Sequence, residues 1–256
     1  MKSEIRGIIF DIDGVLTYQG KVYPGARETV EYLRNQGIIL RFLTNSTLKS
    51  RKSCADKLNK AGFHINTSEV ITASYATAMY LRKKNPVSCW VMLDGEGLQE
   101  FKEFRHNENN PEYIIVGDYR NNFNFNNMNK ALRLMIKGSQ LIVMIPELID
   151  TSLGEIELNV GSWAGMLERA TGTKAVYVGK PNPFVFDLTV DTTGLPKERV
   201  CIVGDSISTD IQGANNVGIK SVLLKTGAFE IEKHLVRTVK TDWIVDSIEE
   251  VGHLFA

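Results

Sequence analysis

The sequence predicts an α/β protein with a Rossmann-like core, a parallel sheet flanked by helices, that carries a smaller inserted α/β cap domain. Short apolar runs alternate with helix-length segments along the chain, which is the βαβ rhythm of a parallel sheet. The rhythm changes near residue 73 and resumes near residue 177 without a long linker, which favours an insertion over two tandem domains. With 256 residues the chain is long enough for both parts.

Three groups of elements follow from this pattern. In the first part of the core we expect strands around 5–10, 38–43 and 70–71 and helices around 25–36 and 48–61. In the insertion we expect helices around 73–84, 124–137 and 162–170 and strands around 89–93, 113–116 and 140–145, with the asparagine-rich stretch 121–127 acting as a helix cap. After Gly172 we interpret the chain as returning to the first domain, with strands around 174–178, 200–203 and 219–224 and helices around 183–191 and 208–216. The domain bounds are 1–72 and 178–256 for the core and 73–177 for the insertion.

Composition excludes several classes of function. Thirty basic residues balance thirty acidic ones, so no overall field attracts nucleic acid. The three cysteines lie far apart and form no Cys-x-x-Cys pair, which argues against a disulfide framework or a zinc site: Cys54, Cys89 and Cys201. The apolar stretch Gly7–Phe10 is too short for a signal peptide, and Leu141–Ile145 is too short to cross a bilayer. We expect a cytoplasmic protein without membrane or nucleic-acid partners.

Four apolar segments end in polar residues suited to phosphate chemistry. These are Asp11 and Asp13 after the first strand, Thr44 and Asn45 after the second, Lys180 after 176–179, and Asp205 after 200–204. Taken alone, the Asp11–Asp13 pair is equally typical of a turn, and Thr44 and Asn45 are also typical helix caps. Because the carboxyl ends of parallel strands lie at one edge of a sheet, we expect all four groups to converge. Convergence favours a ligand site over four unrelated turns.

The order and spacing of these residues resemble the haloacid dehalogenase superfamily. The matching motifs are Asp11-Ile-Asp13-Gly-Val15, Thr44-Asn45, Gly179-Lys180-Pro181 and Gly204-Asp205-Ser-Ile-Ser-Thr-Asp210. The chain also resembles the branch with a large α/β cap after the second motif, which includes 4-nitrophenyl-phosphatases and phospholysine phosphohistidine inorganic pyrophosphate phosphatases. Two stretches, 123–134 and 175–183, are most similar to the latter group.

The resemblance implies a magnesium-dependent phosphatase that acts on a small phosphorylated substrate. Asp11 would be the nucleophile that forms an aspartyl phosphate, and Asp13 its acid–base partner. Thr44, Asn45 and Lys180 would bind the phosphoryl group, whose negative charge otherwise repels a carboxylate nucleophile.

Oxygen ligands suit Mg²⁺, and the resemblance assigns them to the Asp11 carboxylate, the Asp13 main-chain carbonyl and the Asp205 carboxylate. Asp210 is expected to orient Lys180 or a metal-bound water. The chain departs from the family at Ser208, where relatives often carry an acid, and at residues 117–119, where relatives tend to have Gly-Leu-Asp. Substrate contacts are therefore not carried over to the latter segment.

Three alternatives use the same core. A dehalogenase needs no metal and lacks the second acid, so Asp13 argues against it, and a phosphomutase more often carries a different cap. A protein that only binds a phosphorylated ligand is the non-enzymatic alternative. A cap that closes through hinges at 72–75 and 173–179, and a homodimer formed through the cap, are further expectations from the resemblance. The motifs account only for contacts with the phosphoryl group and do not identify the rest of the substrate.

Overall fold

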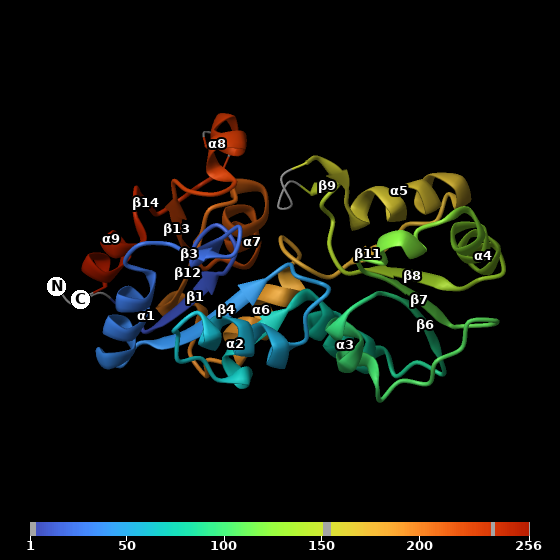
Figure 1. Ribbon diagram of the computed structural model, residues 1–256, viewed down its shortest axis with the longest axis horizontal. Helices are drawn as coiled ribbons and strands as arrows, with labels where there is room; N and C mark the ends of the chain where they lie inside the picture. Colours follow the sequence, from blue (N-terminus) through green and yellow to red (C-terminus); the bar gives the residue numbers. More distant parts are fainter. Residues whose placement is uncertain (1–3, 151–154, 237–238, 256) are drawn as a thin grey trace. The chain divides into compact units, whose positions relative to one another are not determined.

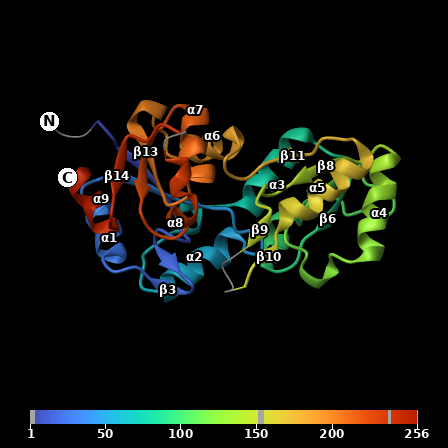
Figure 2. The same ribbon diagram turned by 90° about the horizontal axis from the view of Figure 1, so that it is seen from above.

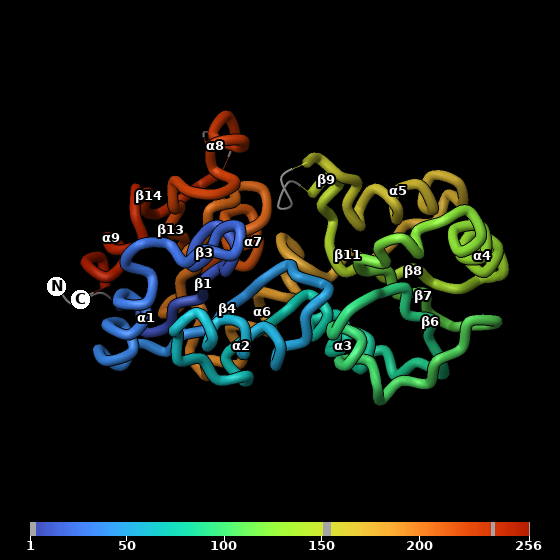
Figure 3. Tube along the Cα trace, in the orientation of Figure 1, coloured from blue at the N-terminus to red at the C-terminus, as the bar shows by residue number. Residues whose placement is uncertain are grey.

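The computed structural model describes residues 4–150, 155–236 and 239–255, and the chain forms two compact units. The first unit comprises the chain up to Thr44, residues 54–71 and the chain from Lys180 onward; the second comprises residues 45–53 and 72–179. The chain therefore passes between the units four times. Figure 3 traces its course from the N-terminus to the C-terminus. Each unit has its own sheet of mainly parallel strands with helices around it, which confirms the predicted α/β class.

The first unit contains a six-stranded sheet in the order β14-β13-β12-β1-β4-β5 (Figure 1). Its strands are β1 (Gly7–Asp11), β4 (Ile39–Thr44), β5 (Val70–Thr72), β12 (Val200–Gly204), β13 (Lys220–Leu224) and β14 (Trp243–Val245), and a hairpin is formed by β2 (Thr17–Tyr18) and β3 (Lys21–Val22). Its helices are α1 (Ala26–Asn35), α2 (Arg51–Lys60), α6 (Pro183–Asp191), α7 (Gln212–Val217), α8 (Phe229–Glu232) and α9 (Ile248–Leu254).

Strand β1 lies inside the sheet, between β12 and β4, and all of its residues are buried. Parallel sheets with both faces covered require such continuous apolar runs. Phe10 of β1 stacks on Phe42 of β4 with ring centroids 6.2 Å apart. One face of the sheet packs against α1, α2 and α9, and Figure 2 shows α6 and α7 on the opposite side.

The strand register brings three carboxyl ends together. Asp11, the last residue of β1, lies opposite Leu43, so β4 ends one residue later at Thr44. On the other side of β1, Phe10 lies opposite Val203, so β12 ends at the same edge. Residues that follow β1, β4 and β12 are therefore neighbours, as expected for adjacent parallel strands.

The second unit contains a four-stranded parallel sheet in the order β11-β8-β7-β6. Its strands are β6 (Cys89–Met92), β7 (Tyr113–Val116), β8 (Gln140–Val143) and β11 (Val176–Tyr177), with a hairpin of β9 (Ile149–Asp150) and β10 (Glu157–Leu158). Its helices are α3 (Ala73–Lys84), α4 (Phe125–Ile136) and α5 (Val160–Thr171). The side chain of Asn124 accepts a hydrogen bond from Asn127 N and caps α4, which confirms the predicted role of the asparagine-rich stretch.

The structure differs from the sequence prediction in several elements. The strand predicted at 174–178 does not return to the core sheet, because Val176 pairs with Ile142 of β8 in the second unit. Helix α2 begins at Arg51, since the hydroxyl of Ser50 accepts from Ser53 N and ends the preceding turn. The helix predicted at 208–216 opens with a π-helical turn, Ile207–Ile211. The two hairpins, β14, α8 and α9 were not predicted.

Candidate active site

A buried lysine joins two of the predicted site residues in the first unit. The Nζ atom of Lys180 lies 2.7 Å from Asp11 Oδ1 and 2.7 Å from Asp210 Oδ1. The side chain of Lys180 is 3% exposed and that of Asp210 is fully buried. Burial alone would lower the pKa of Lys180, but the carboxylates of Asp11 and Asp210 raise it above its ordinary value. Lys180 is therefore held in its charged form.

Asp11 and Asp205 are acids that burial makes costly to ionise. Burial raises the pKa of Asp11 well above its ordinary value against the attraction of Lys180. Burial, with repulsion from Asp210, raises the pKa of Asp205 to about 7. A divalent cation beside such carboxyl groups would favour their ionised forms.

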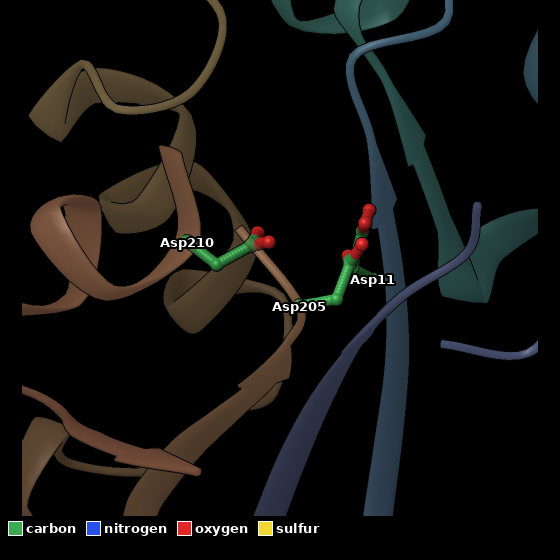
Figure 4. Close-up of side chains that lie close together, drawn as sticks. All are labelled: Asp11, Asp205 and Asp210. Carbon is green, nitrogen blue, oxygen red and sulfur yellow. The ribbon is translucent and has the colours of Figure 1, made fainter. Parts of the chain in front are cut away.

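The three acids fit a divalent cation. Oxygen atoms of Asp11, Asp205 and Asp210 lie within 4.8 Å of one another, and Figure 4 shows the carboxylate of Asp210 directed toward the other two. When all three acids are ionised, the one lysine leaves two negative charges, which one divalent cation would balance. An all-oxygen set of this kind is the type that Mg²⁺ prefers.

Two glycines give Asp205 its place in this cluster. A Cβ atom added to Gly14 would lie 2.1 Å from Asp205 Oδ2, and one added to Gly227 would lie 2.0 Å from the same atom. Both glycines also have positive φ angles, 98° and 48°. The amide of Ala228 donates to Asp205 Oδ2 at 2.6 Å, which orients the carboxylate.

The remaining predicted residues lie outside the buried cluster of acids. Asp13 is exposed, and its carboxylate accepts a hydrogen bond from Thr17 Oγ1 at 3.3 Å. Thr44 is buried at the end of β4. The side-chain amide of Asn45, in the second unit, donates to Glu147 of the same unit. Asn45 thus has a protein partner for its side-chain amide.

Sequence reasoning missed the segment after β13. Besides Ala228 and Gly227, Thr226 contributes a hydroxyl that donates to the carbonyl of Gly14 at 2.5 Å. The available signal was topological: β13 lies beside β12, so the residues that follow it also lie at the carboxyl edge of the sheet.

The fold and this cluster define an α/β enzyme with an acid–lysine site at the carboxyl edge of its sheet. Two family models match the chain: haloacid dehalogenase-like hydrolase over residues 8–105 and HAD-like hydrolase over residues 177–251. Haloacid dehalogenase-like hydrolase domain-containing protein 2 from Homo sapiens is 30% identical over 225 residues, covering 88% of this chain and 86% of the relative. The chain belongs to the haloacid dehalogenase-like hydrolase family, as its motifs predicted.

Named phosphatases are among the similar proteins. Phospholysine phosphohistidine inorganic pyrophosphate phosphatase from Xenopus laevis is 31% identical over 244 residues, covering 90% of this chain and 87% of the relative. Ribonucleotide monophosphatase NagD from Escherichia coli is 28% identical over 249 residues, covering 96% and 98%. The solved structure of a 4-nitrophenylphosphatase from Thermotoga maritima superposes with a TM-score of 0.91 at 27% identity, covering 99% of this chain and 98% of that chain.

One further expectation concerns membranes. In the part of the chain that the structure describes, no helix is both long enough and apolar enough to span a bilayer.

Proposed function

We propose that this chain is a magnesium-dependent phosphatase that hydrolyses a small phosphorylated molecule through an aspartyl phosphate on Asp11. The observation that supports it most is the buried contact between Asp11 and Lys180, because it sets a carboxylate nucleophile beside the positive charge that its attack requires. The named relatives act on different compounds that share a phosphoryl group. They support the reaction class and leave the substrate open.

Charge is the first requirement of the reaction. In our proposal Mg²⁺ is held by the Asp11 carboxylate, the Asp13 main-chain carbonyl and the Asp205 carboxylate, with Asp210 beside them. When bound, it supplies positive charge to the phosphoryl oxygens and keeps the neighbouring carboxyl groups ionised. Lys180 supplies a second positive charge from within the protein.

Two displacements at phosphorus complete the proposed reaction. In the first, an oxygen of Asp11 bonds to phosphorus while the bond to the leaving oxygen breaks, and Asp13 donates a proton to that oxygen. In the second, Asp13 removes a proton from water, which attacks phosphorus and releases phosphate and the free Asp11 carboxylate. Asp13 is exposed and so can exchange its proton with solvent. Thr44 and the main-chain amide of Asn45 would donate to the phosphoryl oxygens.

The two units take different parts in this proposal. The first unit carries the reacting groups, as expected for the core predicted at 1–72 and 178–256, and the second would act as the cap that selects the substrate. Segment 45–53 joins the second unit although it lies before the predicted insertion. A panel of small phosphorylated compounds, from nucleotides and sugar phosphates to pyrophosphate, would identify the substrate class.

Phosphate release from 4-nitrophenyl phosphate tests the proposal. We expect turnover with Mg²⁺ and none after chelation, and Asp11→Asn should lower kcat by ~10⁴-fold or more because it removes the nucleophile. The matched control is Asp246→Asn, which makes the same change at an exposed residue of the first unit paired with Lys225. Rapid turnover by Asp11→Asn, or turnover that is independent of metal, would contradict the mechanism.

A further inference from the structure

Glu232, the last residue of α8, holds the loop that follows β12. Its Oε2 atom accepts hydrogen bonds from the main-chain amides of Ile207 and Ser208, at 2.6 and 2.9 Å. The hydroxyl of Ser208 donates to Oε1 at 2.6 Å, and the hydroxyl of Ser206 donates to Oε2 at 3.1 Å. One carboxylate therefore contacts three consecutive residues.

Those three residues lie between two carboxylates of the candidate cation site, Asp205 and Asp210. The amide of Ser206 donates to Asp210 Oδ2 at 3.3 Å, while its hydroxyl donates to Glu232. The other oxygen of Asp210 accepts from Lys180. A continuous series of hydrogen bonds thus runs from Glu232 through Ser206 and Asp210 to Lys180. Movement of the loop would change the position of Asp205 and the contact of Asp210 together.

The segment that ends in Glu232 also contacts Asp205 at its beginning. The amide of Ala228 donates to Asp205 Oδ2, and Gly227 leaves no room for a side chain beside the same atom. Residues 227–232 therefore contact the loop at two points, before and after its turn. A loop fixed at both points loses less conformational freedom when a cation binds.

The carboxylate of Glu232 is itself no part of the cation cluster. The cluster found among the described residues consists of Asp11, Asp205 and Asp210. The oxygens of Glu232 are instead directed at the first amides of a helical segment, where the partial positive charge of the helix stabilises an anion. This arrangement places a further carboxylate beside the loop without making it a member of the cluster.

We propose that Glu232 is a positioning residue for the cation site: it fixes the loop 205–208 and thereby the separation of Asp205 and Asp210, without contacting cation or substrate. This inference rests on the cation site of the proposed function. Residues that hold metal ligands in place typically contribute about 10- to 100-fold in metal affinity. We therefore expect the loss of Glu232 to weaken the binding of Mg²⁺ more than it lowers the rate at saturating Mg²⁺.

Three substitutions separate the position of the carboxylate from its charge. Glu232→Ala removes every contact, and Glu232→Asp shortens the side chain by one methylene, so it cannot reach all three residues. Glu232→Gln keeps the length and one acceptor oxygen for the two amides, and its NH₂ group can donate to the serine hydroxyls. A positioning role predicts loss of affinity in the order Ala, Asp, Gln.

Calorimetric titration of the metal-free protein with Mg²⁺, without substrate, measures this affinity. We expect Glu232→Ala to raise the Kd by ~10-fold or more and Glu232→Gln by less than about threefold. The control is Glu230→Ala in the same short helix, because Glu230 is exposed and pairs only with Lys233 among the described residues. A Kd for Glu232→Ala equal to that of Glu230→Ala would overturn the proposal. So would Glu232→Gln binding as weakly as Glu232→Ala, because the charge would then matter and the held loop would not.

Two further measurements keep the result unambiguous. If circular dichroism shows that Glu232→Ala is unfolded, Glu232→Asp becomes the deciding variant, and an unchanged Kd for it overturns the proposal. In assays of phosphate release, Glu232→Ala should raise the Mg²⁺ concentration that gives the half-maximal rate more than it lowers the rate at saturating Mg²⁺.

The wild type separates failure of this inference from failure of the proposed function. If the wild type binds Mg²⁺ without releasing phosphate, the phosphatase function fails while the binding test of Glu232 stands. If the wild type binds no Mg²⁺, the cation site and this inference fail together.

Discussion

Both units have acids at the carboxyl ends of parallel strands, and among the described residues the first unit buries a cluster of three of them, Asp11, Asp205 and Asp210. In the second unit, Asp94 follows β6 and Asp118 follows β7, and both are partly exposed. The amide of Asn122 donates to both oxygens of Asp94, and Arg120 pairs with Asp118 at 3.1 Å. In the first unit, the buried carboxylates outnumber their one lysine. Acids at a sheet edge are therefore common to both units, whereas a buried cluster of acids is found in the first unit, where it fits a divalent cation.

Replacing the basic side chain beside the acids of each unit should give the largest difference in stability between the two edges. We expect Lys180→Met to lower the free energy of unfolding by about 3–5 kcal/mol, because it leaves Asp11 and Asp210 buried without their partner. Arg120→Met should cost less than about 1 kcal/mol, since exposed ion pairs contribute little. Urea unfolding of both variants in EDTA makes the comparison.

Activity provides a second readout for the same pair. Lys180→Met should lower kcat for 4-nitrophenyl phosphate by ~10²-fold or more, as expected when one donor to a developing negative charge is lost. Equal losses of stability in Lys180→Met and Arg120→Met would show that burial does not distinguish the two edges.

The pH dependence of the free energy of unfolding should show a smaller difference between the acids of the two units. The pKa of Asp205 is about 7 in the folded protein, and an unperturbed aspartate titrates near pH 4, so the folded state binds this proton more tightly. Protonated Asp205 therefore stabilises the metal-free protein at low pH, and this contribution is lost as the pH rises from about 4 to about 7. The raised pKa of Asp11 acts in the same direction.

We expect the loss to amount to a few kcal/mol in EDTA and to be smaller with Mg²⁺, which favours the ionised site. Urea unfolding at fixed pH values, with Asp205→Asn and Asp118→Asn in parallel, isolates the contribution. Asp205→Asn should flatten the decline and Asp118→Asn should leave it unchanged. A wild type whose metal-free stability rises across this interval relative to Asp205→Asn would contradict the raised pKa.

The sequence allowed prediction of what short apolar runs and topology determine. Asp11 and Asp205 were placed at one sheet edge because parallel strands all end on the same side, and the structure brings them together with Asp210. Lys180 also contacts Asp11, but the strand that precedes it, β11, belongs to the sheet of the second unit, so the reason given for its position was wrong. The partner of β11 could not be predicted, since a two-residue strand carries no pattern that selects a neighbour. The same holds for Glu232, whose contacts span 24 to 26 residues from a helix of four.

Side-chain partners across long separations were equally beyond sequence reasoning. Asn45 meets Glu147, which lies 102 residues later in the chain, and no local pattern links the two. The side-chain amide that the sequence offered as a donor to a phosphoryl group therefore has a tertiary partner, and the role of Asn45 stays a prediction. Strand ends follow from local sequence, whereas the exact set of donors around a ligand depends on packing.

The smallest expected effect is at Asp94, and it tests the comparison from the side of the second unit. Asp94→Asn removes a negative charge but keeps an oxygen that can accept from Asn122, so the free energy of unfolding should change by less than about 1 kcal/mol. Turnover of 4-nitrophenyl phosphate should stay within about twofold of the wild type, because this small substrate offers the enzyme little beyond its phosphoryl group. A tenfold loss of kcat would instead place the edge of the second sheet in the reaction, and the buried acid cluster of the first unit would no longer account for the site by itself.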